Sequence, residues 1–161
     1  MKNITRRQFL AATSTAFAFP YVGRVLGAND KLNIGVVGVA GRGASNLKGV
    51  SGENIVALCD VSTSNLAGAK KQFSNAKTYS DFRKMLEQKD LDAVVCSTPD
   101  HTHAIVGVSA LKSGRHLYCE KPLAHTVSEV RAMTEAARKH KRATQMGNQI
   151  HSGTNYRRVV E

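Results

Sequence analysis

Residues 32–43 read LNIGVVGVAGRG, an apolar run rich in Val and Ile that passes directly into a glycine-rich turn. Read as G-x-G-x-x-G, the turn has Gly38 and Gly43 at its outer positions and Ala40 at the middle one. Gly38 permits the tight turn, a small residue at position 40 lets the backbone approach a pyrophosphate, and Gly43 allows helix and strand to pack closely. The stretch therefore predicts a phosphate-binding turn before a helix N-terminus, with cofactor contacts from Gly38, Ala40, Gly41, Arg42 and Gly43. The alternative is a strand–turn–helix unit that binds nothing.

An acidic residue closes the second predicted strand. Residues 54–59 form a β-type run, and Asp60 follows it, 22 residues after Gly38. A carboxylate at that place binds the ribose diol of an adenosine and repels a 2′-phosphate. Neither Lys nor Arg occurs from Val61 to Ala69 to neutralise such a phosphate. Asp60 is thus a predicted cofactor ligand, and NAD is the expected cofactor, with NADP as the alternative.

Strand-like and helix-like segments alternate along the rest of the chain. Short apolar runs predict strands at 32–39, 54–59, 78–79, 93–97, 115–119 and 142–146. Capping residues and helical spacing predict helices at 42–50, 62–72 and 102–112, and others that begin at 80 and at the capping box of Thr126 and Glu129. The expected buried stripes of the last two helices are Ile105, Val108 and Leu111, and Val127, Val130, Met133 and Ala137. Six strands separated by helices predict an α/β fold with a doubly wound parallel (Rossmann) sheet, covered on both faces.

Two polar loops follow the fourth and fifth predicted strands. They read STPDHTH at residues 97–103 and Glu120-Lys121-Pro122. Ligands of a doubly wound sheet bind outside the carboxyl ends of its strands, so both loops are expected to face the cofactor. A lysine placed there can exchange a proton with a substrate hydroxyl. The alternatives are a surface Lys121 paired with Glu120 and, for His101, an exposed turn histidine rather than a substrate contact.

Together, the glycine loop, Thr98-Pro99 with His103, and Glu120-Lys121-Pro122 resemble the glucose–fructose oxidoreductase / inositol dehydrogenase / rhizopine-catabolism (Gfo/Idh/MocA) family. The resemblance covers residues 32–161 and implies an NAD(P)-dependent oxidoreductase that transfers hydride to or from a sugar, cyclic polyol or related pyranoside. It also implies a homo-oligomeric parent protein with a second, α+β substrate domain. We expect this domain to be absent from the chain, which would then be competent only for cofactor binding.

The resemblance implies a role for several individual residues. Lys121 becomes the catalytic lysine that orients the substrate and relays a proton, and Glu120 binds the ribose near the nicotinamide. Pro122 is expected in a cis or tightly turned peptide. The nicotinamide half is expected to be lined by Ser97, Thr98, Pro99, His103, Lys121 and Gln149. Arg157 is expected to reach the cofactor from a linking helix.

These predictions divide the chain into a signal peptide at 1–28, a dinucleotide-binding domain at 29–149 and the start of a linker at 150–161.

Two other functions remain open besides the oxidoreductase. The first is a glycosidase that uses NAD transiently, oxidising and re-reducing one substrate. The second is a non-catalytic dinucleotide-binding module.

The pattern of residues 1–28 predicts an export signal. Arg6-Arg7 stands before Phe9-Leu10 and an uncharged apolar run to Phe19, which is too short to span a bilayer stably. Paired arginines in this setting resemble a twin-arginine signal. The expected partner is the twin-arginine export machinery, and the expected location is the periplasm. The alternative is an ordinary amphipathic N-terminal helix.

Composition excludes some functional classes. The formal net charge is +11, of which +4 lies in the predicted signal peptide, and the remainder is scattered. Trp is absent and aromatic content is 6%, so no nucleic-acid partner is expected. The three cysteines end apolar runs and are expected to be small buried hydrophobes. A metal site would have to gather Cys119 with His101, His103 and His116, but their spacing matches no compact ligand pattern, so no metal is expected.

Overall fold

The computed structural model describes residues 30–149; the predicted export signal, Arg157 and the predicted linker lie outside the described residues. Within them the strands are β1 (Asn33–Val37), β2 (Asn54–Cys59), β3 (Lys77–Tyr79), β4 (Ala93–Cys96), β5 (His116–Glu120) and β6 (Thr144–Gly147). The helices are α2 (Arg42–Gly49), α3 (Thr63–Gln72), α4 (Phe82–Leu86), α5 (Asp100–Lys112) and α6 (Val127–His140). No helix in this part of the chain is long and apolar enough to cross a membrane.

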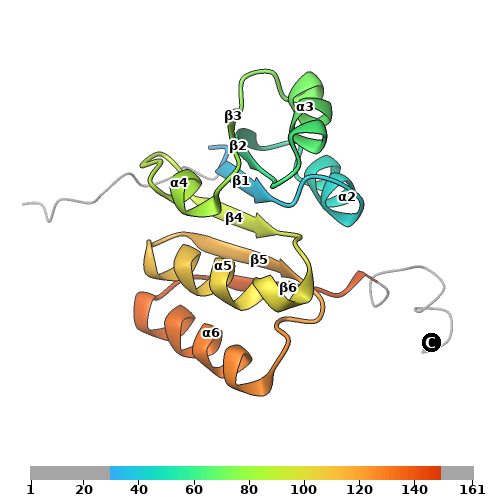
Figure 1. The fold of residues 1–161 in the computed structure, drawn as a ribbon. Helices are drawn as coiled ribbons and strands as arrows, with labels where there is room; N and C mark the ends of the chain where they lie inside the picture. The colour runs from blue at the N-terminus through green and yellow to red at the C-terminus, as the bar shows by residue number, and fades with distance from the viewer. Residues whose placement is uncertain (1–29, 150–161) are drawn as a thin grey trace, which may run out of the picture. The chain divides into compact units, whose positions relative to one another are not determined.

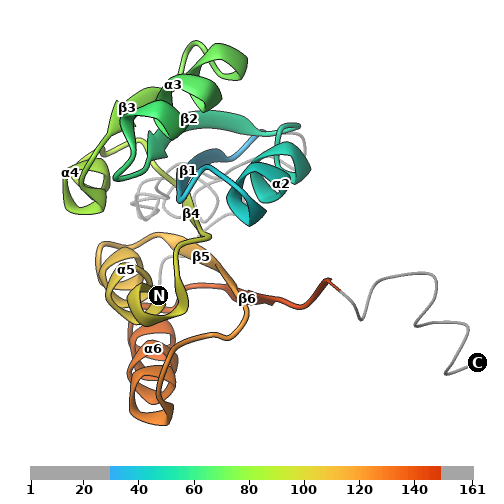
Figure 2. The same cartoon turned by 45° about the vertical axis from the view of Figure 1, so that its right-hand side comes forward.

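The strands of the described region form one parallel sheet in the order β3-β2-β1-β4-β5-β6 (Figures 1 and 2). The chain builds outward from β1 to β3, then returns to place β4 beside β1 and continues to β6. The strand order therefore reverses between β1 and β4, which is the place where doubly wound sheets bind their ligands. The predicted fold class is confirmed.

Strand side chains alternate between two apolar clusters, one on each face of the sheet. Val36 and Val95 belong to the cluster that contains residues of α2 and α3, whereas Val94 and Cys119 belong to the one that contains residues of α4, α5 and α6. Because successive strand residues point to opposite faces, β5 presents Cys119 to the α5 side and Glu120 to the α2 side. This alternation decides which chemical groups meet at the carboxyl edge.

The predicted caps and buried cysteines are confirmed. Ser62 caps α3 by accepting a hydrogen bond from the Asn65 N–H at 3.4 Å, and Thr126 with Glu129 forms a complete capping box on α6. The three cysteines are buried and unpaired (Cys59, Cys96 and Cys119). All three side chains lie in the apolar cluster on the α4, α5 and α6 side of the sheet.

Two helix starts and parts of two stripes were predicted wrongly. Helix α5 begins at Asp100 rather than at 102, with Pro99 in the cap position, and Asp81 rather than Ser80 caps α4. The expected stripe residues Ile105 and Val127 are 58% and 68% exposed. In α5 the contact face is formed by small residues such as Gly107, where an added Cβ would lie 2.6 Å from Met133 Cε. Hydropathy underrates small residues, although they allow the closest packing.

Candidate functional site

The glycine loop connects β1 to α2 at the carboxyl edge of the sheet. Gly38 has φ +82°, its N–H donates to the Cys59 carbonyl at 2.8 Å, and a Cβ added there would lie 2.7 Å from the Ser97 carbonyl oxygen. A Cβ on Gly43 would collide with the carbonyl of Gly38. Both glycines are therefore required by close backbone approach, as the motif predicts, and the turn stays open in front of the N-terminus of α2.

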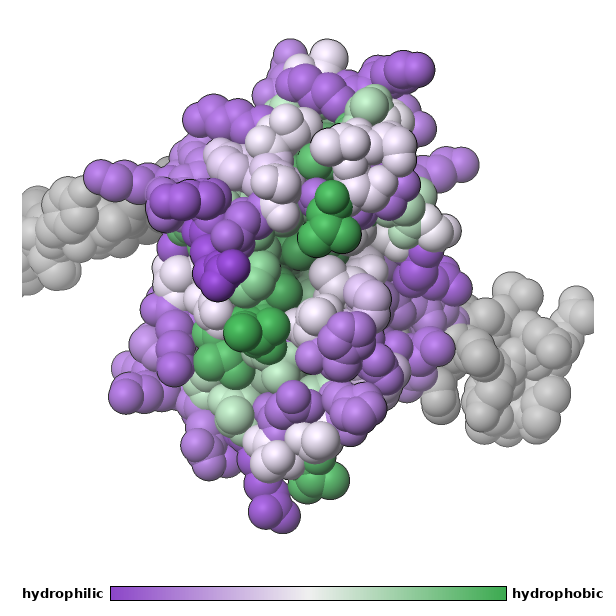
Figure 3. Space-filling model, viewed as in Figure 1, coloured by the Kyte–Doolittle hydropathy of each residue, from purple (hydrophilic) through white to green (hydrophobic). Residues whose placement is uncertain are grey.

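A cavity of about 720 Å³ lies against this loop. Predicted cofactor residues from three different connections meet around it: Gly38, Ala40, Asp60, Ser97, Thr98 and Pro99. Exposed apolar side chains of Val61 and Ile105 also line it. Figure 3 shows apolar surface on this face, between the β2–α3 connection and α5. The cavity thus combines a glycine-rich turn, the carboxylates of Asp60 and Asp81, and apolar walls, as small-molecule sites do.

Asp60 is held at the edge of this cavity by hydrogen bonds. Its Oδ2 accepts from the Val39 N–H at 3.0 Å, and its Oδ1 accepts from the Ser62 N–H at 2.9 Å and from Asn65 Nδ2 at 3.3 Å. The carboxylate therefore joins the glycine loop to the start of α3. Oδ1 thus already accepts two hydrogen bonds, whereas Oδ2 accepts one and has acceptor capacity left for a hydroxyl in the cavity.

The cavity also contains a cation that the sequence interpretation missed. Arg83 of α4 lines it, and its Nε lies 3.0 Å from Asp81 Oδ1. Residues 61–69, directly after Asp60 in sequence, contain no Lys or Arg that could neutralise a phosphate. Because β3 pairs with β2, the residues that follow β3 reach the same edge, and this topology was the signal that could have found Arg83.

Glu120 forms a second polar cluster, on the α2 side of the sheet. The Glu120 side chain is 4% exposed, and its Oε1 accepts from Asn46 Nδ2 at 2.9 Å and from Gln149 Nε2 at 2.5 Å. Burial acts to raise the pKa of Glu120, but these hydrogen bonds, the Lys121 N–H and the nearby Arg42 charge together lower that pKa below its ordinary value. The structure thus brings the predicted Glu120 and Gln149 together, and it adds Asn46, which no motif marked.

Asn46 connects this cluster to the cavity. Its Nδ2 also donates to Ser97 Oγ at 2.8 Å, so one amide holds both loops. Lys121 follows Glu120 and is exposed, and the Lys121–Pro122 peptide is cis, one of the two conformations expected for it. The roles of Lys121 and Glu120 toward a ligand stay predictions.

His103 lies beneath the loops and not among the residues that line the cavity. Its side chain is 2% exposed, and its ring nitrogens contact the Thr98 and Pro122 carbonyls. Potential ligand atoms of Cys96, His103 and Cys119 lie within 4.8 Å of one another. This group differs from the expected one of Cys119 and His103 with His101 and His116. Chain spacing does not show that Cys96 and Cys119 face each other across β4 and β5.

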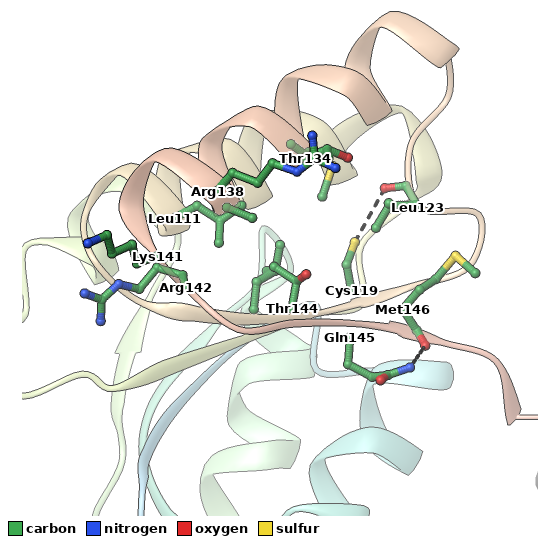
Figure 4. A pocket seen from close by; sticks show the side chains of 13 residues that line it. Leu111, Cys119, Leu123, Thr134, Arg138, Lys141, Arg142, Thr144, Gln145 and Met146 are labelled. Atoms are coloured by element: carbon green, nitrogen blue, oxygen red, sulfur yellow. Dashed lines mark hydrogen bonds between the residues drawn. The ribbon is translucent and has the colours of Figure 1, made fainter.

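A second cavity, of about 540 Å³, lies between α6 and the β5–β6 edge (Figure 4). Leu111 and Cys119 are among its lining residues, Lys141 and Arg142 lie toward one end, and the Arg138 side chain extends toward Thr134. It lies on the α5–α6 face, whereas the glycine loop leads into α2 on the other face. None of the predicted cofactor residues lines it.

Comparison with known families agrees with this geometry. Residues 32–148 match the model of the Gfo/Idh/MocA group, described as an oxidoreductase family with an NAD-binding Rossmann fold. The matched region contains the glycine loop, Asp60 and both polar loops. It ends just before Gln149.

Individual relatives match over most of this chain. An inositol 2-dehydrogenase from Salmonella typhimurium is 34% identical over 122 residues, which is 72% of this chain and 36% of that protein. A glycosyl hydrolase family 109 protein from Saccharopolyspora erythraea is 32% identical over 127 residues, covering 71% of this chain and 28% of that protein. A probable dehydrogenase structure from Thermotoga maritima superposes with TM-score 0.73 at 26% identity, covering 80% of this chain and 39% of that one. The chain spans about a third of the length of the curated relatives it matches.

Proposed function

This chain belongs to the Gfo/Idh/MocA oxidoreductase family, and from that membership we propose that residues 30–149 bind NAD in the cavity beside the glycine loop. One observation carries the proposal: a single cavity of about 720 Å³ joins the Gly38 turn, the Asp60 carboxylate and the Ser97–Pro99 loop. The residues fit the cofactor because the cavity reaches the backbone of the turn at Gly38 and Ala40, directly before the N-terminus of α2. Backbone N–H groups at the start of α2 would hold the pyrophosphate.

The other residues follow from that placement. Asp60, which lines the cavity, would accept a hydrogen bond from the adenosine ribose, and Val61 and Ile105 would cover the apolar parts. The nicotinamide half would be held by Ser97–Pro99 and by the loop of Glu120 and Lys121, which Asn46 joins to Ser97. Bound NAD supplies the hydride acceptor or donor, and Lys121 orients a substrate hydroxyl and exchanges its proton.

We propose NAD(P)-dependent hydride transfer to or from a sugar, cyclic polyol or related pyranoside as the activity of the whole protein. The similarity to an inositol 2-dehydrogenase supports this substrate class. Because the chain spans about a third of such relatives, any longer form of this protein is the one to assay for turnover. We also propose that this protein is a homo-oligomer. We further propose that it is exported through the twin-arginine route, and periplasmic fractionation of R6K/R7K against wild type would test this export.

A second function has its own support, because one relative is a glycosyl hydrolase family 109 protein. An NAD-dependent glycosidase would oxidise and re-reduce the same substrate. Release of phenol from a p-nitrophenyl glycoside without net NADH would favour this function. NADH formation with a free polyol would favour the dehydrogenase.

Calorimetric titration of NADH into the 161-residue chain tests cofactor binding. We expect binding in wild type and its loss in Gly38→Val, because the new side chain would meet the Ser97 carbonyl. Gly49→Ala is the matched control, since nothing lies within 4 Å of a Cβ added there. A melting curve on each variant shows that it is folded, and folded wild type without NADH binding would contradict the proposal.

A further inference from the structure

The two loops of the site are joined by one buried ring. His103 Nε2 lies 2.7 Å from the Thr98 carbonyl oxygen, in the loop after β4, and Nδ1 lies 2.7 Å from the Pro122 carbonyl oxygen, in the loop after β5. A carbonyl oxygen can only accept a hydrogen bond, so each ring nitrogen must carry a proton to make its contact. A neutral imidazole has one N–H. The two contacts together fit the doubly protonated form.

A cation buried this deeply requires a partner of opposite charge. The available partner is a thiol, because Cys96, Cys119 and His103 present their polar atoms within 4.8 Å of one another and all three are buried. The pKa of Cys96 is lowered to about 6, chiefly by a hydrogen bond between the Cys96 and Cys119 side chains. Burial raises this pKa, whereas hydrogen bonds with Thr98 and the charge of His103 lower it further. The same contact raises the pKa of Cys119, so Cys96 is the thiol that ionises.

We propose that His103 is a buried imidazolium with the Cys96 thiolate as its counter-ion, and that it is a positioning residue that holds the 97–99 loop at a set distance from the 120–122 loop. The positioning role rests on the proposed NAD site, since these loops carry its nicotinamide half. The charge pair does not depend on it. The same three side chains could ligate a soft metal ion, but both ring nitrogens already contact carbonyls, which leaves no lone pair for a metal.

Nitrogen NMR of the uniformly ¹⁵N-labelled 161-residue chain at neutral pH tests the charge state, with His103→Gln used for assignment. We expect two protonated ring nitrogens for His103. One unprotonated ring nitrogen, or a shift of a ring nitrogen on addition of Zn²⁺, would overturn the imidazolium. Ultraviolet thiolate absorption should disappear in Cys96→Ser and remain in Cys119→Ser, which leaves Cys96 and the His103 ring in place. Persistence in Cys96→Ser would overturn the counter-ion.

Ligand binding tests the positioning role. We expect His103→Gln to weaken NADH binding by about tenfold or more, as for loss of a charged hydrogen bond, with ADP-ribose binding nearly unchanged because it lacks the nicotinamide half. His125→Gln, an exposed histidine in the following loop, is the matched control and should change neither affinity. Unchanged NADH binding in His103→Gln, or equal loss of both ligands, would overturn the positioning role.

Cys96→Ser provides a second variant if His103→Gln does not fold. It keeps the ring and removes the counter-ion, so one ring nitrogen should lose its proton and NADH binding should weaken with the same selectivity. Two protonated nitrogens with unchanged NADH affinity would overturn the counter-ion role. If wild type binds no NADH, the proposed function fails and the positioning role fails with it, whereas the NMR result still decides the charge state.

Discussion

At the scale of single residues, the site depends on close approaches and shared acceptors. Gly38 and Gly43 are required because the backbone of the turn folds against Ser97 and against itself. Asp60 holds that turn through the Val39 N–H at 3.0 Å and faces the cavity at the same time. One carboxylate thus positions the phosphate cradle and offers oxygens to a ribose.

Replacing Asp60 with Asn should weaken NADH binding by about tenfold to a hundredfold, because a charged acceptor of ribose hydroxyls is lost. NADPH binding should change little, which would narrow the preference between the two cofactors. Calorimetric titrations of both cofactors measure this, with the exposed Asp90→Asn as the control. An unchanged NADH affinity in Asp60→Asn would exclude Asp60 as the ribose ligand.

Glu120 should make the free energy of unfolding depend on pH in the acidic range. Its pKa is lowered in the folded chain, so its contribution to the free energy of unfolding is fully present above the unfolded value of about 4.3 and is lost as pH falls through the folded value. Glu120→Gln lacks this contribution. Urea unfolding between neutral pH and pH 3 should show the wild-type advantage shrinking in acid, and a constant difference would argue against this assignment.

At the scale of elements, chain-local signals determine where helices begin, and neighbouring elements determine which side is buried. The α6 capping box satisfies the first turn with side chains three residues apart, and it was predictable for that reason. The buried face of α5 was not, because α6 packs against Gly107 rather than against Ile105.

Thr126→Ala should lower the free energy of unfolding by about 1 kcal/mol, because the Glu129 N–H loses its side-chain acceptor. Thr134→Ala, at an exposed interior position of α6, is the control and should not destabilise, since Ala is the better helix former. Chemical denaturation of both variants provides the comparison. Equal effects would show that the cap contributes nothing specific.

At the scale of the whole molecule, the sheet collects the site from distant parts of the chain. Asn46 and Glu120 are 74 residues apart in sequence, yet one amide joins them, because β1 and β5 both flank β4 and end at the same edge. A ligand that contacts the loops after several strands binds only when the whole sheet is folded, and its binding therefore raises the free energy of unfolding of the whole sheet.

NADH at one hundred times its dissociation constant should therefore raise the free energy of unfolding by about 2.7 kcal/mol, because only the folded chain offers the site. Thermal melts at increasing NADH concentration measure this. The melting temperature of Gly38→Val should not rise with NADH. A wild-type melting temperature that does not change with NADH concentration would contradict the cofactor site.

The sequence by itself determined the fold class, the glycine loop, the Asp60 position and the α6 cap. Each of these depends on spacing along the chain: period-two and helical patterns, a six-residue turn, and residues that end a strand. Only the tertiary structure placed Arg83 in the cavity, joined Asn46 to Glu120 and set His103 against Cys96 and Cys119. Those contacts depend on which strands become neighbours and on which face of the sheet each side chain lies. Helical crossovers bring distant residues together, and their separation in sequence does not predict that they will be in contact.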